Sequence, residues 1–197
     1  MKHRCAWVNN DPLYIDYHDK EWGIPVQDDQ KMFEFLVLET FQAGLSWYTI
    51  LKKRENFRKA FSDFDYHMVA SYGEADQQRL LQDAGIIRNR QKINAAINNA
   101  QRFIEVQAEW GSFCKYLWAF VDFKPLQNEP GDLSEVPATS PISDRLSKDL
   151  KKRGFKFVGS TTIYAHMQAC GMVNDHTADC FRQKEVKKLA ATVTFQL

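Results

Sequence analysis

Residues 146–171 read LSKDLKKRGFKFVGSTTIYAHMQACG, a basic helical pattern, a short turn with Gly154 and Gly159, and a second helical pattern. The glycines let the backbone of the turn approach a partner closely. The second pattern begins with hydroxyl residues, and the first N–H groups of a helix have no partner within that helix. A helix start of this kind binds anions, and a nucleic-acid phosphate is one of them. The stretch therefore predicts two helices joined by a turn that can hold phosphate.

Four basic residues surround the turn: Lys151, Lys152, Arg153 and Lys156. Two interpretations remain open from the pattern alone. In the first, the turn grips a nucleic-acid backbone without reading its sequence. In the second, it is an ordinary corner between two helices with a solvated basic face.

The rest of the chain predicts an all-α fold. The segment 31–41, KMFEFLVLETF, is apolar nearly all round, which is typical of a buried helix. Ser46 is a suitable cap for the next helix, and Gly111 is a suitable end for a long one. Further helices are predicted at 47–61, 65–72, 74–86, 88–110, 113–121, 143–153 and 161–171. No stretch alternates with period two for long enough to predict a sheet, and the proline-rich segment 124–141 predicts a surface connection.

Composition places limits on the function. The chain has 197 residues, of which 44% are hydrophobic and 13% aromatic, and its net charge is +1. Since the protein is not basic overall, contact with nucleic acid must come from local patches. Four cysteines in a chain of this length do not predict a disulfide framework. No apolar run reaches membrane-spanning length and no secretory signal is evident, so we expect a cytoplasmic monomer that binds no membrane.

Two half-sites for a metal lie at the two ends of the chain. Cys5 and His18 are near the start, and His176 and Cys180 are near the end. If the stretch from His176 to Cys180 is helical, its two ligands share a face. Two thiolates and two imidazoles make a closed tetrahedral set, which suits structural zinc. The alternative is that the cysteines are small buried hydrophobic residues and the histidines are ordinary polar ones.

Glu39 stands among apolar neighbours, so its burial is expected. A buried carboxylate needs a partner or a function. The following loop supplies Gln42, Gly44, Leu45 and Trp47, and an acid beside an indole can hold a flat, polar or cationic ring. The alternative is that Glu39 caps a helix or pairs with a surface arginine, and that Trp47 belongs to the core.

These residues together resemble the DNA-3-methyladenine glycosylase I family. The resemblance covers about residues 4–182. It is carried by the following runs, which occur in the family order: RCAWVNNDPLYIDYHDKEWG, LETFQAGLSWYTILKKRENFRKAF, LLQDAGIIRNRQKI, LSKDLKKRGFKFVGSTTIYAHMQACGMVNDH and HTADC.

The resemblance implies a helix-hairpin-helix DNA glycosylase fold with a structural zinc site that tethers the N- and C-terminal regions. Cys5, His18, His176 and Cys180 would be the zinc ligands. Residues 1–30 plus 165–197 would form a zinc-clasped terminal lobe, and 31–164 a helical domain with most of the base pocket and the hairpin. Glu39 would be the catalytic residue, an anion that favours a cationic base, with Tyr17, Trp47, Trp7 and Trp22 around that base.

The DNA-binding residues would come from two segments. Leu45, in the run Gln42-Ala43-Gly44-Leu45, would wedge into the gap left by the flipped nucleotide, and the hairpin would grip the backbone. The full set is Gln42, Gly44, Leu45, Lys151, Arg153, Gly154, Lys156, Gly159, Ser160 and Thr161.

The expected activity is excision of 3-methyladenine from alkylated double-stranded DNA, which leaves an abasic site and free 3-methyladenine. Many glycosylases of the wider superfamily carry a catalytic aspartate after the hairpin, and the resemblance places Asn174 at that position here. We therefore expect selection of the lesion by binding, because the methylated base is already a good leaving group. Two alternatives remain: a non-catalytic zinc-containing DNA-binding module and a zinc hydrolase.

Overall fold

The computed structural model describes residues 2–194, which are mostly helical, as the sequence predicts. The elements, in chain order, are α1 (Pro12–Lys20), α2 (Asp29–Gln42), α3 (Trp47–Ala60), η1 (Ser62–Phe64), α4 (Tyr66–Ala70), α5 (Glu74–Gln82), α6 (Arg90–Trp110), α7 (Phe113–Ala119), β1 (Leu126–Gln127), η2 (Leu133–Glu135), α8 (Pro141–Lys152), α9 (Ser160–Ala169), β2 (Val173–Asn174) and α10 (Phe181–Thr192). Met1 and residues 195–197, which the sequence assigned to the terminal lobe, lie outside the described residues. Among residues 2–194, none of the helices combines the length and apolar character needed to cross a bilayer.

Local signals set most helix boundaries. The Ser46 hydroxyl accepts a hydrogen bond from the Thr49 N–H at the start of α3, so the predicted cap is confirmed. Gly111 ends α6 with φ at +82°, the left-handed conformation that glycine adopts readily. The helix expected over 74–86 ends earlier, at Gln82, because Asp83 adopts an extended conformation.

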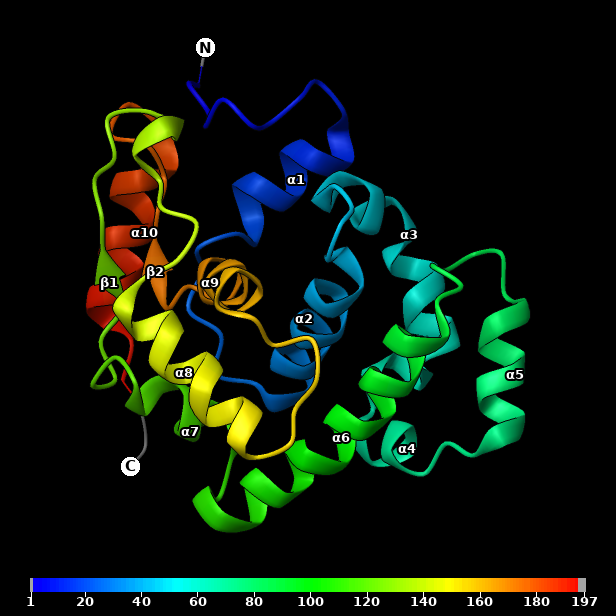
Figure 1. Cartoon of the computed structure of the whole chain (residues 1–197). Coiled ribbons are helices and arrows are strands. Elements are labelled where there is room, and N and C mark those ends of the chain that lie inside the picture. Colours follow the sequence, from blue (N-terminus) through cyan, green and yellow to red (C-terminus); the bar gives the residue numbers. More distant parts are fainter. Residues whose placement is uncertain (1, 195–197) are drawn as a thin grey trace.

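Helix α2 is the centre of the molecule. All ten residues from Met32 to Phe41 are buried, so the predicted buried helix is confirmed. Figure 1 shows α2 between α9 on one side and α3 and α6 on the other. The Asp29 carboxylate, in the first turn of α2, also accepts from the backbone N–H groups of Phe113 and Cys114 at the start of α7. A helix buried on every side can carry polar residues only where they have partners or a function.

The sequence did not predict α1, α10, the two strands or the short 3₁₀ helices η1 and η2. Strands β1 and β2 form a short parallel pair in which Leu126 lies opposite Val173, and two residues are too few to show alternation. Helix α10 begins directly after Cys180 and buries Val186 at 1% exposure. Its amphipathic pattern is weak because charged residues fill most of its surface.

The N-terminal segment is bound to the C-terminal part by backbone hydrogen bonds. The Gly23 N–H donates to the Gln168 carbonyl (3.1 Å), and the Val26 N–H donates to the Cys170 carbonyl (3.0 Å). Gly171 has φ at +69°, and a Cβ there would collide with the backbone of Ile24 and Pro25. The close approach of residues 23–26 to the end of α9 therefore requires glycine at 171.

We expect Gly171→Ala to lower the free energy of unfolding by at least about 3 kcal/mol, since it adds a backbone collision to a strained conformation. Gly111→Ala is the matched control, because φ is equally positive there but nothing lies within 4 Å of the added Cβ. It should cost only about 1 kcal/mol. Chemical denaturation of both variants measures the difference, and equal losses would show that the close approach is unimportant.

Candidate functional site

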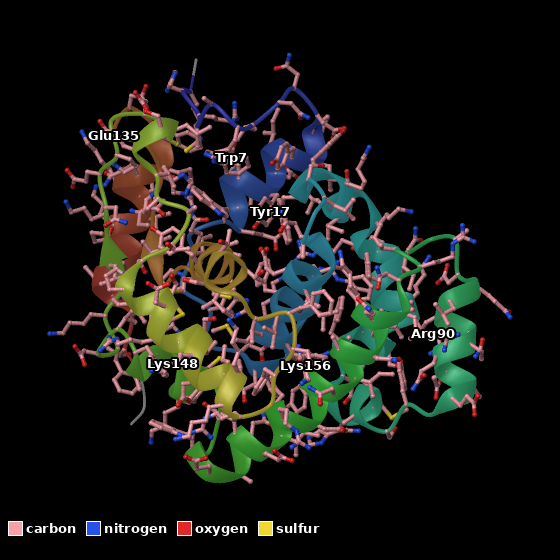
Figure 2. The ribbon with its side chains drawn as sticks, viewed as in Figure 1. Trp7, Tyr17, Arg90, Glu135, Lys148 and Lys156 are labelled. Atoms are coloured by element: carbon pink, nitrogen blue, oxygen red, sulfur yellow. The ribbon has the colours of Figure 1, made fainter. Side chains whose placement is uncertain are left out.

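A cavity of about 600 Å³ lies between the N-terminal segment, α1, α2, α9 and the loop that carries η2. A second cavity, beside Glu34 and Arg58, has a volume of only about 260 Å³. Figure 2 shows Trp7 and Tyr17 beside α1, at the face where this loop and α9 meet. The volume is large enough for a nucleotide rather than a base alone.

Aromatic rings form one wall of the cavity. All four residues predicted to surround a base line it: Trp7, Tyr17, Trp22 and Trp47. The Tyr17 and Trp47 ring centroids are 5.4 Å apart, and those of Trp7 and Trp22 are 5.0 Å apart. Tyr14 also lines the cavity but was not predicted from the sequence. The centroids of its ring and the Trp7 ring are 5.0 Å apart. Its position three residues before Tyr17 could have indicated that both side chains lie on one face of α1.

Glu39 lines the same cavity and is only 3% exposed. It has no hydrogen-bond or ion-pair partner within the described part of the chain, so it neither caps a helix nor pairs with an arginine. Burial raises the pKa of Glu39 to about 8. At pH 7 the side chain is therefore mainly the neutral acid in the protein alone, whereas the sequence analysis treated it as an anion.

Glu34, five residues earlier on α2, shows the opposite behaviour. Its carboxylate accepts from the Arg54 guanidinium (2.8 Å) and from Arg58 (2.9 Å). Burial would raise its pKa, but hydrogen bonds and charge from Arg54, with help from Lys31, lower it to about 2. One helix thus carries a paired and a solitary buried carboxylate, and the solitary one faces the cavity.

The turn between α2 and α3 forms part of the cavity rim. Gln42, Ala43 and Gly44 line the cavity, and the Leu45 side chain is 38% exposed. The Gln42 amide donates to the Leu45 carbonyl (2.6 Å), which closes the turn. An exposed leucine beside a deep cavity suits insertion into a base stack.

Lys92 holds this turn in place and was missed by the sequence analysis. Its ammonium group donates to the Phe41 carbonyl (2.9 Å) and to the Ala43 carbonyl (2.6 Å) at the end of α2. The side chain is 7% exposed, and burial lowers its pKa. A cation at the carbonyl end of a helix is also favoured by the helix dipole.

Helices α8 and α9 and the turn between them form the predicted hairpin. Gly154 has φ at +90°, and a Cβ at Gly159 would meet nothing within 4 Å. Asn99 holds the turn through two hydrogen bonds with Lys156, from the Lys156 N–H (2.8 Å) and to its carbonyl (2.9 Å). Asn98 donates to the Gly154 carbonyl (2.9 Å). Both asparagines lie on α6, and neither was singled out from the sequence.

The basic side chains of the hairpin differ in availability. Lys151, Lys152 and Lys156 are exposed, and Lys156 marks the hairpin in Figure 2. The Arg153 guanidinium is instead paired with Asp149 (2.8 Å) and Glu109 (2.6 Å). At the start of α9, no side chain caps the helix, and Thr161 lines the cavity.

Cys5, His18, His176 and Cys180 come together as one buried cluster whose ligand atoms all lie within 4.8 Å of one another. The Cys5 thiol lies 3.5 Å from His176 Nδ1, and the Cys180 thiol lies 3.5 Å from His18 Nε2. Tetrahedral zinc, with bonds of about 2.3 Å to sulfur and 2.0 Å to nitrogen, separates such ligand pairs by about 3.5 Å. The cluster could therefore hold a metal ion.

The surroundings orient both imidazoles toward the centre of the cluster. His18 donates from Nδ1 to Asp19 (2.8 Å), and His176 Nε2 contacts the Trp22 carbonyl (3.2 Å). Each histidine thus keeps its other nitrogen for a metal, a pattern common around metal ligands. Arg4 in turn holds the Asp19 carboxylate (2.7 Å).

The backbone conformation that brings His176 and Cys180 together differs from the helix considered from the sequence. The stretch from His176 to Cys180 is a turn, in which the Cys180 N–H donates to the Thr177 carbonyl (2.8 Å), rather than a helix. Cys180 then precedes the first residue of α10. The spacing of the two ligands fits the cluster because the turn, like a helix, brings residues four apart into proximity.

Asn174 does not face the cavity. Its amide donates to Gln127 (3.0 Å) and to the Gln183 carbonyl (3.1 Å), away from the cavity lining. The next residue, Asp175, lines the cavity at 2% exposure. The sequence analysis missed Asp175, although successive side chains in extended backbone point to opposite sides.

An acid and several aromatic rings in a nucleotide-sized cavity, beside a basic helical hairpin, are the construction of a base-removing glycosylase. Comparison with known proteins identifies the family. A model of the methyladenine glycosylase family matches residues 7–183, and the chain belongs to this family.

Individual relatives agree with the family model. The chain is 54% identical to DNA-3-methyladenine glycosylase 1 of Escherichia coli strain K12, over 90% of this chain and 95% of that protein. A crystal structure of a 3-methyladenine DNA glycosylase I superposes with a TM-score of 0.89, at 52% identity over 91% of this chain and 98% of the other. A structure that describes 3-methyladenine recognition by the Staphylococcus aureus enzyme gives 0.88, at 39% identity over 91% and 96%.

We expect Glu39→Gln to remove a pH-dependent loss of stability. The pKa of Glu39 in the folded protein, about 8, lies above the ordinary value of 4.5 for a glutamate in the unfolded chain. The wild type is therefore fully stabilised below pH 4.5 and loses stability as the pH rises through 8, by a few kcal/mol. The variant should unfold at a higher denaturant concentration than the wild type at pH 9, and the gap should shrink toward pH 5.

Glu34→Gln is the control with the opposite sign. Because the Glu34 pKa is lowered to about 2, its stabilisation is present at neutral pH and is lost only as the pH falls from 4.5 through 2. That variant should be less stable than the wild type at pH 7. If Glu39→Gln follows wild type at every pH, Glu39 is not a solitary buried acid.

Proposed function

We propose that this protein flips 3-methyladenine out of alkylated DNA and removes it by hydrolysis of the glycosidic bond, which leaves an abasic site. The observation that carries the proposal is Glu39, a buried acid without a partner, in a cavity lined by Tyr17 and Trp47. A fold does not tolerate such a group unless it has a use. The related Staphylococcus aureus enzyme, whose structure describes 3-methyladenine recognition, supplies the identity of the base.

The protonation state of Glu39 gives a physical basis for selecting a methylated base. Adenine is neutral, whereas N3-methylation in DNA makes it a cation. A cation beside Glu39 favours the ionised form and adds charge attraction in a region of low dielectric constant. Neutral adenine leaves the acid protonated and gains no such attraction. The aromatic rings of Tyr17 and Trp47 would hold either base but favour the cation.

Contacts with DNA would come from the turn between α2 and α3 and from the hairpin formed by α8 and α9. Leu45 would fill the space in the stack when the nucleotide leaves it, a step that costs a few kcal/mol. The N–H groups at the start of α9, with Lys151, Lys152 and Lys156, would hold the backbone phosphates. We assign Arg153 to the support of the hairpin, because its guanidinium already binds two carboxylates.

A non-catalytic DNA-binding module is the alternative. It would need the hairpin and the exposed lysines but not the cavity. The unpaired Glu39 favours the enzyme, since a module without a base pocket gains nothing from the cost of burying it.

We further propose that the cysteine and histidine cluster holds structural zinc, which tethers the N- and C-terminal regions to each other in one terminal lobe (1–30 plus 165–197) beside the helical domain (31–164). Four buried protein ligands complete a tetrahedral shell, and this argues against a zinc hydrolase, whose metal keeps an open position. The cluster also supports the cavity wall, because two of its histidines pack against tryptophan rings. The ring centroids of Trp7 and His18 are 5.2 Å apart, and those of Trp22 and His176 are 4.5 Å apart.

The activity is tested with duplex DNA treated with a methylating agent. Wild type should release free 3-methyladenine and leave abasic sites without cutting the strand. Glu39→Gln should release it at least about 100-fold more slowly, because a neutral amide cannot supply the charge. Glu105→Gln, an exposed residue on α6, should match the wild type. Binding of the duplex without any base release would favour the non-catalytic module.

The metal is tested by elemental analysis of the purified chain, which should contain one zinc per molecule. Cys180→Ser should lower the zinc content and reduce the free energy of unfolding by several kcal/mol. Cys114→Ser replaces a buried cysteine outside the cluster and should keep the zinc. Equal zinc contents in both variants, or no zinc in the wild type, would contradict the proposal that the cluster holds zinc.

A further inference from the structure

Asp175 is a buried carboxylate that has no part in the proposal above. It follows β2 and lines the cavity at 2% exposure. Its Oδ2 accepts from the Tyr164 hydroxyl (2.7 Å) and from the Gln168 amide (2.8 Å), and its Oδ1 accepts from the Asn128 amide (2.7 Å). Two segments, α9 and the residue after β1, therefore supply three donors to this one side chain.

Both Asp175 carboxylate oxygens act as hydrogen-bond acceptors. A protonated carboxyl group would offer a donor of its own, but the amides of Asn128 and Gln168 present N–H groups to both of its oxygens. A carboxylate has about four lone-pair sites, and three of them are occupied here. The remaining site is available on the cavity side. A charge buried in this way costs free energy, which the three donors offset in part.

Asp175 and Glu39 divide the cavity into two chemically different parts. Glu39 comes from α2 with the aromatic rings of Tyr17 and Trp47, whereas Asp175 lies beside Gln168 of α9. Figure 1 shows α9 between α2, which carries Glu39, and β2, which directly precedes Asp175. The α9 part is continuous with the start of that helix, where Thr161 also lines the cavity. A nucleotide with its base against Glu39 and its phosphate at the hairpin would bring its sugar to the α9 part.

We propose that Asp175 stabilises the positive charge that develops on the deoxyribose as the base departs. The inference rests on the proposed glycosylase function. The C1′–N9 bond breaks and its electron pair stays with the base, which leaves as neutral 3-methyladenine. The positive charge passes from the base to the sugar, as in other glycoside cleavages. The oxygen of a water molecule then bonds to C1′, and the water gives its proton to solvent.

The two acids thus act at different moments. Glu39 is mainly neutral in the protein alone and favours the cationic base when it enters. The three donors fix the position of the Asp175 carboxylate before the substrate arrives. A fixed charge in a site of low dielectric constant costs no reorganisation when the bond breaks. Selection by binding would then be joined by direct stabilisation of the transition state.

The test compares two duplexes that carry an abasic-site analogue. One contains a pyrrolidine, which is protonated and mimics the charged sugar, and the other contains the neutral tetrahydrofuran. Wild type should bind the pyrrolidine duplex at least about tenfold more tightly. Asp175→Asn should bring the ratio of affinities close to one and slow single-turnover release of 3-methyladenine about 100-fold. Its affinity for free 3-methyladenine should stay within about threefold of the wild type, because Glu39 and the rings are untouched.

Tyr164→Phe is the matched control, since it removes one donor and keeps the carboxylate. Tyr164→Phe should retain the preference for the pyrrolidine duplex. If Asp175 has a purely structural role, Asp175→Asn should weaken the binding of both duplexes equally and leave the ratio of affinities unchanged. If Asp175→Asn loses zinc or fails to fold, Asp175→Ser supplies a smaller neutral side chain.

Wild type that shows no preference between the duplexes overturns the inference whatever the variants do. Failure of the proposed function is a separate outcome, namely a wild type that releases no base from methylated DNA. An active wild type together with an equally active Asp175→Asn overturns the role of Asp175 alone.

Discussion

The attachment of the first 26 residues to the end of the chain is the constraint on which the site depends. Helix α1 packs against α3, but Trp7, Tyr17 and Trp22 reach the cavity only because residues 3–26 also lie against α9 and the turn before α10. Backbone hydrogen bonds, the glycine at 171 and the cysteine and histidine cluster all act at this junction. Joining segments more than 140 residues apart carries a loop-closure cost. Several independent contacts offset this cost, so the aromatic wall is fixed before a ligand arrives.

Burial alone does not decide what a carboxylate does in this fold. Glu34 and Glu39 occupy one helix and are about equally hidden from solvent, yet arginines surround the first and only the cavity faces the second. Asp175 represents a third case, in which neutral donors rather than cations hold the charge. Glu34, which is paired with arginines, has a structural role. Glu39, which has no partner, is sensitive to protonation. Asp175, which is held by neutral donors, keeps its charge available to a substrate.

Short-range signals predicted the parts of the molecule that depend on neighbouring residues. Ser46 and Gly111 set helix boundaries through contacts within one turn, and the buried pattern of α2 follows from its own sequence. The wall of aromatic residues and the four clustered ligands were anticipated through a family resemblance that covers nearly the whole chain. Lys92, Asn99 and Asp175 were missed because each has partners 10 to 60 residues away, so no local pattern marks them. Helix α10 was missed because it is stabilised by the surface it covers rather than by its own amphipathic pattern.

Helix α6 connects the two surfaces proposed to meet DNA. Lys92 fixes the turn that carries Leu45, and Asn99 fixes the hairpin through Lys156. Seven residues separate Lys92 from Asn99, which is two helical turns and about 10 Å along one face. A helix that is buried along one face holds this separation with little variation, whereas two free loops would not. The distance between Leu45 and the hairpin, the two proposed DNA contacts, is therefore set by α6. In the proposed complex the DNA would have to bend and open to match this spacing, because the protein does not adjust it.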